Sequence, residues 1–262
     1  MGEDLWFITC MAAVLAVSAA GAKIPALIGA TDRRIHLMIS FSAGIFLGVL
    51  FLVLIPEAFE EAESSGRDAH EVMYVMLAGF LGILLFDFAY KHRGGQGCGC
   101  SQCADARSHD VASLSAFAGL AIHACFDGVA LAAAFSVGGE AGAAVIAAVC
   151  VHKLVEAFAL SSAFMLSSRK KRSARYLAAF CLATPLAGAA AYMFMRGAEA
   201  EATWIAFAAS AGIFAFVTLM DMLPEAFHRR ETDVRSLLLL LAGLAAVVAM
   251  ALMAAAAGGH AH

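Results

Sequence analysis

The sequence has little charge and almost no proline. Of its 262 residues, 15% are Asp, Glu, Lys or Arg, four are proline and 62% are hydrophobic. A typical soluble domain carries about 25% charged residues, so the composition argues against a soluble protein. Apolar runs of about 20 residues are typical of helices that cross a membrane. There are eight, at residues 4–28, 36–60, 71–91, 111–137, 141–167, 174–196, 202–228 and 234–257. We therefore predict an all-α integral membrane protein with eight transmembrane helices.

Two sequence signals that would favour another class of protein are absent: the basic start of a cleaved signal peptide and the helix motif of zinc proteases. The chain starts with the acidic segment MGEDLW, whereas a cleaved signal peptide starts with basic residues. The first span is therefore expected to remain in the protein. The chain also lacks H-E-x-x-H, the helix motif of zinc proteases, and its nine histidines are too scattered for a His-rich di-iron site. A membrane metallo-enzyme is thus the weaker alternative to a transport protein.

Basic residues are nearly absent from every second loop. The loops after spans one, three, five and seven hold 13 of the 17 Lys and Arg residues, whereas the other loops hold only Arg67 and Arg196. Because cytoplasmic loops collect basic residues, we expect both termini outside the cytoplasm and a location in the cell (inner) membrane. The outer loops are acidic, which either concentrates cations or only keeps these loops solvated.

One apolar segment occurs twice. SAGIFLGVLFLVLIPEAF, at residues 42–59, and SAGIFAFVTLMDMLPEAF, at residues 210–227, align without a gap and share ten of eighteen residues. The first segment belongs to the second span and the second to the seventh, so the two run through the membrane in opposite directions. The match predicts an inverted repeat, which is common in secondary transporters and places the substrate near the midplane.

A second internal match carries ionisable residues. HACFDGVALAAAF begins at His123 and HKLVEAFALSSAF at His152, and in each the histidine precedes an acid, Asp127 or Glu156, by four residues. That spacing puts both side chains on one helical face. A carboxylate at mid-membrane is costly and is normally paired or functional. Two imidazoles and two carboxylates suit zinc and related divalent metals. The alternative is a pair of His–acid hydrogen bonds that only stabilise helix packing.

These motifs resemble those of the ZIP family of divalent-metal transporters. The resemblance covers the whole chain as one transporter domain, residues 1–262, and includes TPLAG in the sixth span and DMLPEAF in the seventh. It implies a three-plus-two-plus-three inverted fold, a homodimer and import of zinc, or of iron, manganese or cadmium, by alternating access. It also implies that the four ligands of the transported metal are His123, Asp127, His152 and Glu156. No cofactor beyond that ion and no nucleic-acid partner are expected.

Three positions depart from the family pattern. Ala124, Lys153 and Thr184 stand where many ZIP proteins have residues that help bind a second metal ion. Two of these replacements remove good ligands, and Lys153 adds a positive charge. The sequence therefore resembles a single-metal variant, with Lys153 near the place of the second ion.

The path of the metal follows from the same resemblance. Metal is expected to enter past the acidic outer surface and Glu57, and to leave past Asp221, Glu225 and His228. The remaining alternative is an exporter of the cation-diffusion type. Those proteins also use intramembrane His and Asp, but they typically have six spans and cytoplasmic termini.

A glycine- and cysteine-containing loop is expected on the cytoplasmic side, at residues 92–110. Cysteines in that compartment stay reduced and can bind soft cations, and glycines make a linker flexible. We expect either a metal-binding loop or a tolerated linker here. The candidate ligands are His92, Cys98, Cys100, Cys103 and His109.

Overall fold

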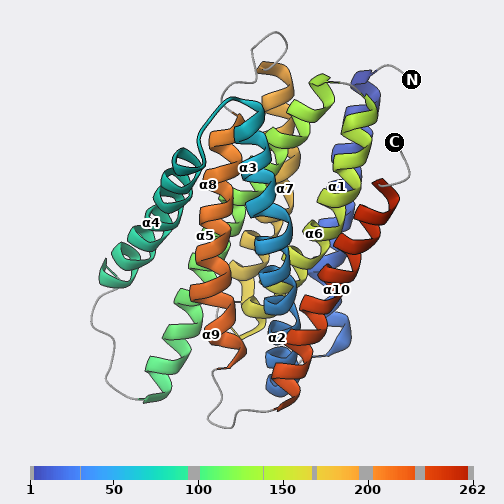
Figure 1. The fold of residues 1–262 in the computed structure, drawn as a ribbon. Coiled ribbons are helices and arrows are strands. Elements are labelled where there is room, and N and C mark those ends of the chain that lie inside the picture. Colours follow the sequence, from blue (N-terminus) through green and yellow to red (C-terminus); the bar gives the residue numbers. More distant parts are fainter. Residues whose placement is uncertain are drawn as a thin grey trace.

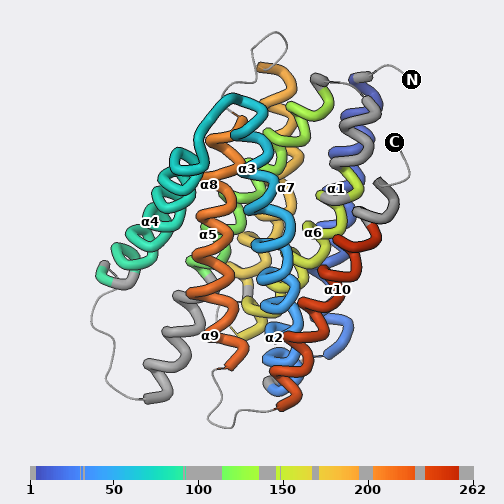
Figure 2. The backbone as a smooth tube through the Cα atoms, viewed as in Figure 1, coloured from blue at the N-terminus to red at the C-terminus, as the bar shows by residue number. Residues whose placement is uncertain are grey.

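A computed structural model gives the fold, which is a bundle of long helices (Figure 1). It describes residues 3–29, 31–93, 101–137, 139–166, 170–194, 203–227 and 234–258, and these residues contain no strand. A chain with 62% hydrophobic residues can cross lipid only if its backbone groups are satisfied internally, which a helix does within one segment. Figure 2 traces the same path as a tube.

Eight helical segments are long and apolar enough to cross a membrane, as the sequence predicts. Six are single helices, whereas the second and seventh spans each contain a π-helical segment, labelled η. The helices are α1 (Glu3–Ile28), α2 (Asp32–Val49), η1 (Leu50–Leu54), α3 (Ile55–Ser64), α4 (Ala69–Arg93), α5 (Ser101–Val137), α6 (Gly139–Leu166), α7 (Lys170–Phe194), α8 (Thr203–Phe216), η2 (Val217–Met222), α9 (Leu223–Ala226) and α10 (Val234–Gly258). We call α2, η1 and α3 together the α2–α3 rod, and α8, η2 and α9 the α8–α9 rod.

The largest difference from the expected boundaries is at the start of α5. This helix begins at Ser101, ten residues before the expected span, and α4 continues to Arg93. Residues 92–93 and 101–110 of the expected loop are therefore helical. The stretch SQCADARSHD contains no Gly or Pro to stop a helix, so the backbone can stay helical past the apolar run.

Four of the eight membrane-spanning segments form the interior of the bundle, and the other four surround them. In the α2–α3 rod, α5, α6 and the α8–α9 rod, between 50% and 67% of the most apolar stretch is buried, against 17% to 33% in α1, α4, α7 and α10. The outer helices pack in pairs with inner ones: α1 on α6, α7 on α5, α4 on α8 and α10 on α2. The site residues predicted from the paired His–acid motifs thus lie on two interior helices, α5 and α6.

The two matching segments pack in the same way. Gly44 of α2 lies against the backbone of Leu240 in α10, and Gly212 of α8 lies against the backbone of Met76 in α4. A Cβ atom at either glycine would fall 1.9 Å from the carbonyl oxygen of the neighbouring helix. Small residues allow helices in membranes to approach this closely. These glycines occupy the same position of the repeated SAGIF sequence.

Both segments also widen into a π-helix just before their proline. The Ile55 N–H donates to the Leu50 carbonyl in η1, and the Leu223 N–H donates to the Thr218 carbonyl in η2. Proline has no N–H and disturbs the hydrogen-bond ladder of the preceding turn, and π-helical turns often occur at functional sites. The two rods run in opposite directions in Figure 1. The inverted repeat of the whole fold remains a prediction.

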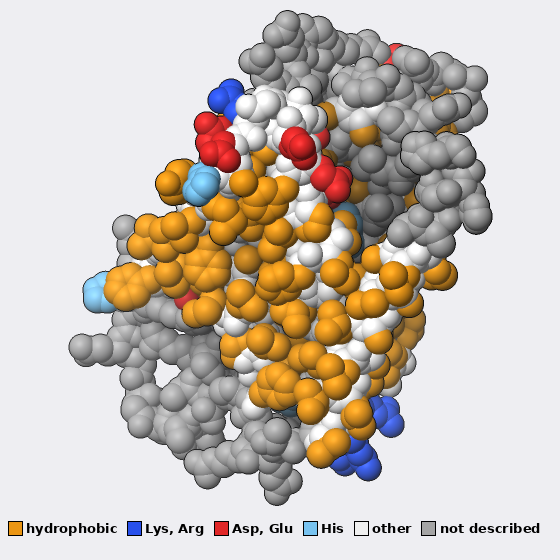
Figure 3. Space-filling view, viewed as in Figure 1, with side chains coloured by type: hydrophobic (Ala, Val, Ile, Leu, Met, Phe, Trp, Pro, Cys, Tyr) orange, Lys and Arg blue, Asp and Glu red, His pale blue; other side chains and the backbone are white. Residues whose placement is uncertain are grey.

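The charged side chains separate towards the two ends of the bundle. We call the end that holds Glu60, Glu61, Glu63, Asp68 and Glu71 the acidic end, and the end that holds Arg33, Arg34, Arg172, Arg175 and Arg235 the basic end. In Figure 3, acidic side chains lie near the top, most basic ones near the bottom, and a broad hydrophobic surface between them. Such a band is what a membrane-spanning surface requires.

We predict that Gly212→Ala destabilises the bundle although alanine is the better helix former. The added methyl group would meet the Met76 carbonyl, so α4 and α8 must separate, and overpacking of this kind typically costs about 1–3 kcal/mol. Gly82→Ala is the matched control, because a Cβ atom there has nothing within 4 Å. Thermal unfolding in detergent should show a lower midpoint for Gly212→Ala and an equal or higher one for Gly82→Ala. Equal midpoints in both variants would contradict the close contact.

Candidate metal centre

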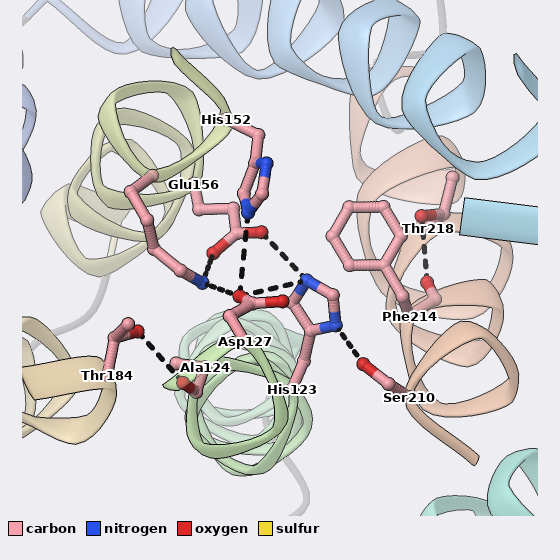
Figure 4. A network of polar contacts seen from close by, with 10 residues as sticks. His123, Ala124, Asp127, His152, Glu156, Thr184, Ser210, Phe214 and Thr218 are labelled. Carbon is pink, nitrogen blue, oxygen red and sulfur yellow. Dashed lines mark hydrogen bonds and ion pairs between the residues drawn. The ribbon is translucent and has the colours of Figure 1, made fainter. Parts of the chain in front are cut away.

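The four candidate ligands converge between the antiparallel helices α5 and α6. His123 and Asp127 lie one turn apart on α5, and His152 and Glu156 lie one turn apart on α6 (Figure 4). One ligand atom from each of the four lies within 4.8 Å of the others. His123 is about midway along the apolar stretch of α5. The side chains paired by sequence spacing therefore do meet in one cluster.

The contacts within this cluster run through one nitrogen of each histidine. His123 Nε2 lies 3.1 Å from Glu156 Oε1 and 3.5 Å from Asp127 Oδ2. His152 Nε2 lies 3.5 Å from the same Asp127 oxygen. His123, Asp127 and Glu156 are buried, whereas His152 keeps 14% of its side chain exposed. Two nitrogens and two carboxylates thus face a common centre.

Lys153 is the fifth member of this cluster. Its Nζ donates to Asp127 Oδ2 and to Glu156 Oε2, and only 1% of its side chain is exposed. The same Nζ lies 5.5 Å from the centre of the Phe180 ring. A buried charge is tolerated when it is paired and hydrogen-bonded. With neutral histidines, one ammonium group and two carboxylates leave the cluster with a single formal negative charge.

The other two replaced positions offer no ligand towards this cluster. Ala124 has no polar side chain, and the Thr184 hydroxyl of α7 donates to the Ala124 carbonyl at 2.8 Å. Both residues are fully buried. That hydrogen bond ties α7 to α5.

A cavity of about 430 Å³ reaches the cluster from the acidic end. Its lining includes Glu57 and the exposed Glu60 of α3, and it extends to Asp127 and His152. Ser210 of α8 also lines it. The carboxylates of Glu57 and Glu60 thus line the cavity that leads to His152, the partly exposed histidine of the cluster.

The expected exit residues lie towards the basic end. The Ser115 hydroxyl of α5 lies 3.0 Å from both carboxylate oxygens of Asp221 in η2. Glu225 of α9 lies 3.8 Å from His36 Nδ1 of α2, and both side chains are mostly buried. His228 lies outside the described residues.

The predicted loop ligands are only partly described. His92 is exposed near the end of α4, where its ring stacks on Phe88. Cys98 and Cys100 lie outside the described residues, and Cys103 and His109 belong to the first turns of α5. Their use as metal ligands stays a prediction.

Three polar residues that the motif analysis did not single out contact predicted site residues. Ser210 is hydrogen-bonded to His123 Nδ1, while Ser115 and His36 contact the exit residues. Serine is too common for a motif to reveal such contacts. Ser210 could have been noticed only because it is the first residue of the repeated segment.

Taken together, this arrangement fits a first-row divalent cation. Imidazole nitrogen and carboxylate oxygen are ligands that zinc accepts, and four of them can surround it tetrahedrally. Two carboxylates would also offset the charge of the ion. The same contacts also stabilise α5 against α6 in the absence of a metal.

The sequence is similar to those of known zinc transporters over most of its length. The sequence model of the ZIP zinc transporter family matches residues 4–105 and 91–254. The zinc transporter ZIP9-B of Xenopus laevis is 27% identical over 239 residues, which is 77% of this chain and 78% of that protein. The zinc transporter ZIP9 of Micropogonias undulatus is 25% identical over 244 residues, or 77% and 79% of the two chains. The chain therefore belongs to the ZIP zinc transporter family, and it is a multi-pass membrane transporter of divalent metal rather than an enzyme.

Proposed function

We propose that the protein imports a divalent metal, with zinc as its main substrate, by binding it between His123, Asp127, His152 and Glu156. The observation that supports this most strongly is the convergence of four ligand atoms within 4.8 Å in the interior of a ZIP-family protein. The related proteins are named zinc transporters, which favours zinc. Iron, manganese and cadmium are further candidate substrates because they accept the same kinds of ligand.

The direction of transport is inferred from the two charged ends. Arg33, Arg34, Arg172, Arg175 and Arg235 lie at one end, and cytoplasmic ends of membrane proteins collect such residues. We therefore assign the basic end to the cytoplasm of a cell (inner) membrane, with both termini outside. The cavity that contains Glu57 then faces outwards. Metal attracted by the outer carboxylates would descend through it to His152 and Asp127.

Release would require the site to become accessible from the basic end. Asp221 and Glu225 lie on that side of the bundle, and they offer carboxylates along an exit route that continues towards His228. We propose that the site alternates between access from the acidic end and access from the basic end. We also propose that the transporter works as a homodimer. The cysteines near residues 98–103 would then receive metal on the cytoplasmic side.

Lys153 would act in place of a second metal ion. Its ammonium group already contacts both carboxylates of the site, and the Ala124 and Thr184 positions supply no further ligand. When the site is empty, Lys153 would hold Asp127 and Glu156 and lower the cost of two buried charges. When metal binds, the same positive charge would weaken its binding and so speed its release.

The ligand assignment predicts that His123→Ala and Glu156→Ala abolish zinc uptake. Each variant removes one of the four donors, while His70→Ala, at an exposed histidine of α4, keeps all four and is the control. Purified proteins in vesicles should give uptake equal to protein-free vesicles for the two ligand variants and unchanged uptake for His70→Ala. Size-exclusion profiles that match wild type would show that all three are folded. Uptake near the wild-type rate in both ligand variants would refute the site.

The role of Lys153 predicts that Lys153→Met binds zinc at least tenfold more tightly and turns over more slowly. Two unit charges about 4 Å apart interact by about 4 kcal/mol at an effective dielectric constant near 20, so removal of the ammonium should strengthen binding of a cation. Lys23→Met, which removes an exposed lysine of α1, is the control. Calorimetric titration and initial uptake rates together test this. Binding no tighter than wild type would make Lys153 a purely structural residue.

A further inference from the structure

Two serines hold equivalent places in the repeated segments but have different surroundings. Ser42 is the first residue of the segment in α2, and Ser210 is the first residue of the segment in α8. Both are buried, with 0% and 4% of their surface exposed. Ser210 is hydrogen-bonded to His123 Nδ1, whereas the Ser42 hydroxyl has no hydrogen-bond partner among the described residues. A buried hydroxyl without a partner is unfavourable, because it has lost its hydrogen bonds to water and gained none in the protein.

A contact between Met38 and Ser162, one turn from Ser42, shows how far along the bundle Ser42 lies from the site. Met38 lies one turn before Ser42 on the same face of α2, and its sulfur lies 3.9 Å from Ser162 Oγ of α6. Because α2 and α6 are antiparallel, Ser42 lies level with residue 158 of α6. His152 is six residues nearer the acidic end, which is about 9 Å at a rise of about 1.5 Å per residue.

We propose that the two serines are alternative partners of the two histidines. Ser210 positions His123 while the site faces the acidic end, and Ser42 positions His152 after the site has moved to face the basic end. This inference rests on the alternating access in the proposed function. It adds the residues that hold the metal ligands in each of the two states.

One movement would exchange both partners. A shift of α5 and α6 towards the basic end by about 9 Å, the distance estimated from the helix rise, would bring His152 level with Ser42. The same shift would carry His123 well beyond hydrogen-bonding distance of Ser210. The two helices would move together because they share the cluster of four ligands and Lys153.

The hydrogen bond has a direct use for metal binding. When Nδ1–H of a histidine donates to a serine oxygen, Nε2 keeps its lone pair, and the ring is held with that lone pair towards the metal. His123 is oriented for this arrangement, since its Nδ1 faces the Ser210 hydroxyl and its Nε2 points into the cluster where a metal would bind. Each state would thus have one fixed histidine and one serine without its partner, and the two states would have similar free energies. A carrier that alternates needs such a balance.

A cysteine-accessibility experiment tests the exchange. The reporter is a single cysteine at Ala130, which lines the cavity, in a full-length background whose native cysteines are replaced and which still takes up zinc in vesicles. A membrane-impermeant maleimide is applied from the acidic side. Ser210→Ala should shift the equilibrium about five- to tenfold away from the state described here, as expected for the loss of one hydrogen bond. Because the two states start with similar free energies, this should slow labelling about three- to fivefold. The variant Ser210→Thr, which keeps a hydroxyl group, should label at the parent rate.

The decisive variant combines both substitutions. Ser42→Ala added to Ser210→Ala should return labelling to within about twofold of the parent rate, because each state has then lost one hydrogen bond. Ser18→Ala, which changes a buried serine of α1, should not restore labelling and serves as the control. A double variant that labels as slowly as Ser210→Ala, or an unchanged rate in Ser210→Ala, would overturn the inference. Failure of the parent protein to take up zinc would instead refute the proposed function.

Discussion

Pairing of charge within the membrane is the constraint on which the rest of the structure depends. Asp127, Glu156 and Lys153 lie in the interior of the bundle, where a charge without a partner would be prohibitively costly. Because Lys153 contacts both carboxylates, three charged groups can be buried together. The histidines complete a cluster that is compact enough to bind one cation. In the proposed mechanism, a divalent ion that enters this cluster would compete with Lys153 for the two carboxylates.

The division into inner and outer helices follows from this constraint. α5 and α6 carry all five members of the cluster, so they must be shielded from lipid. The α2–α3 and α8–α9 rods lie against them inside the bundle, whereas only 17% to 33% of the most apolar stretch of α1, α4, α7 and α10 is buried. The close contacts of Gly44 and Gly212 fix the outer helices α10 and α4 to the two rods. In the proposed mechanism, the two rods with α4 and α10 form the frame past which the site moves.

The repeated segment contributes both to the packing of the rods and to the hydrogen bonds of the metal site. Its glycines, its π-helical turns and its prolines occur at matching positions in the two rods. Its two serines have different hydrogen-bonding states, and this is the asymmetry expected if one conformation of a two-state carrier has been captured. The same sequence would then serve the outward state in one rod and the inward state in the other.

The sequence by itself determined the number of spans, the family and the four residues that converge, because hydrophobic run length and four-residue spacing depend only on local helix geometry. It also indicated that Lys153 replaces a ligand. Only the tertiary structure decided which partners these residues have. The contact of Lys153 with Asp127, the Ser210–His123 hydrogen bond and the His36–Glu225 pair each join residues from different helices. No local pattern encodes such contacts, since they depend on how the helices rotate and slide against one another when they pack.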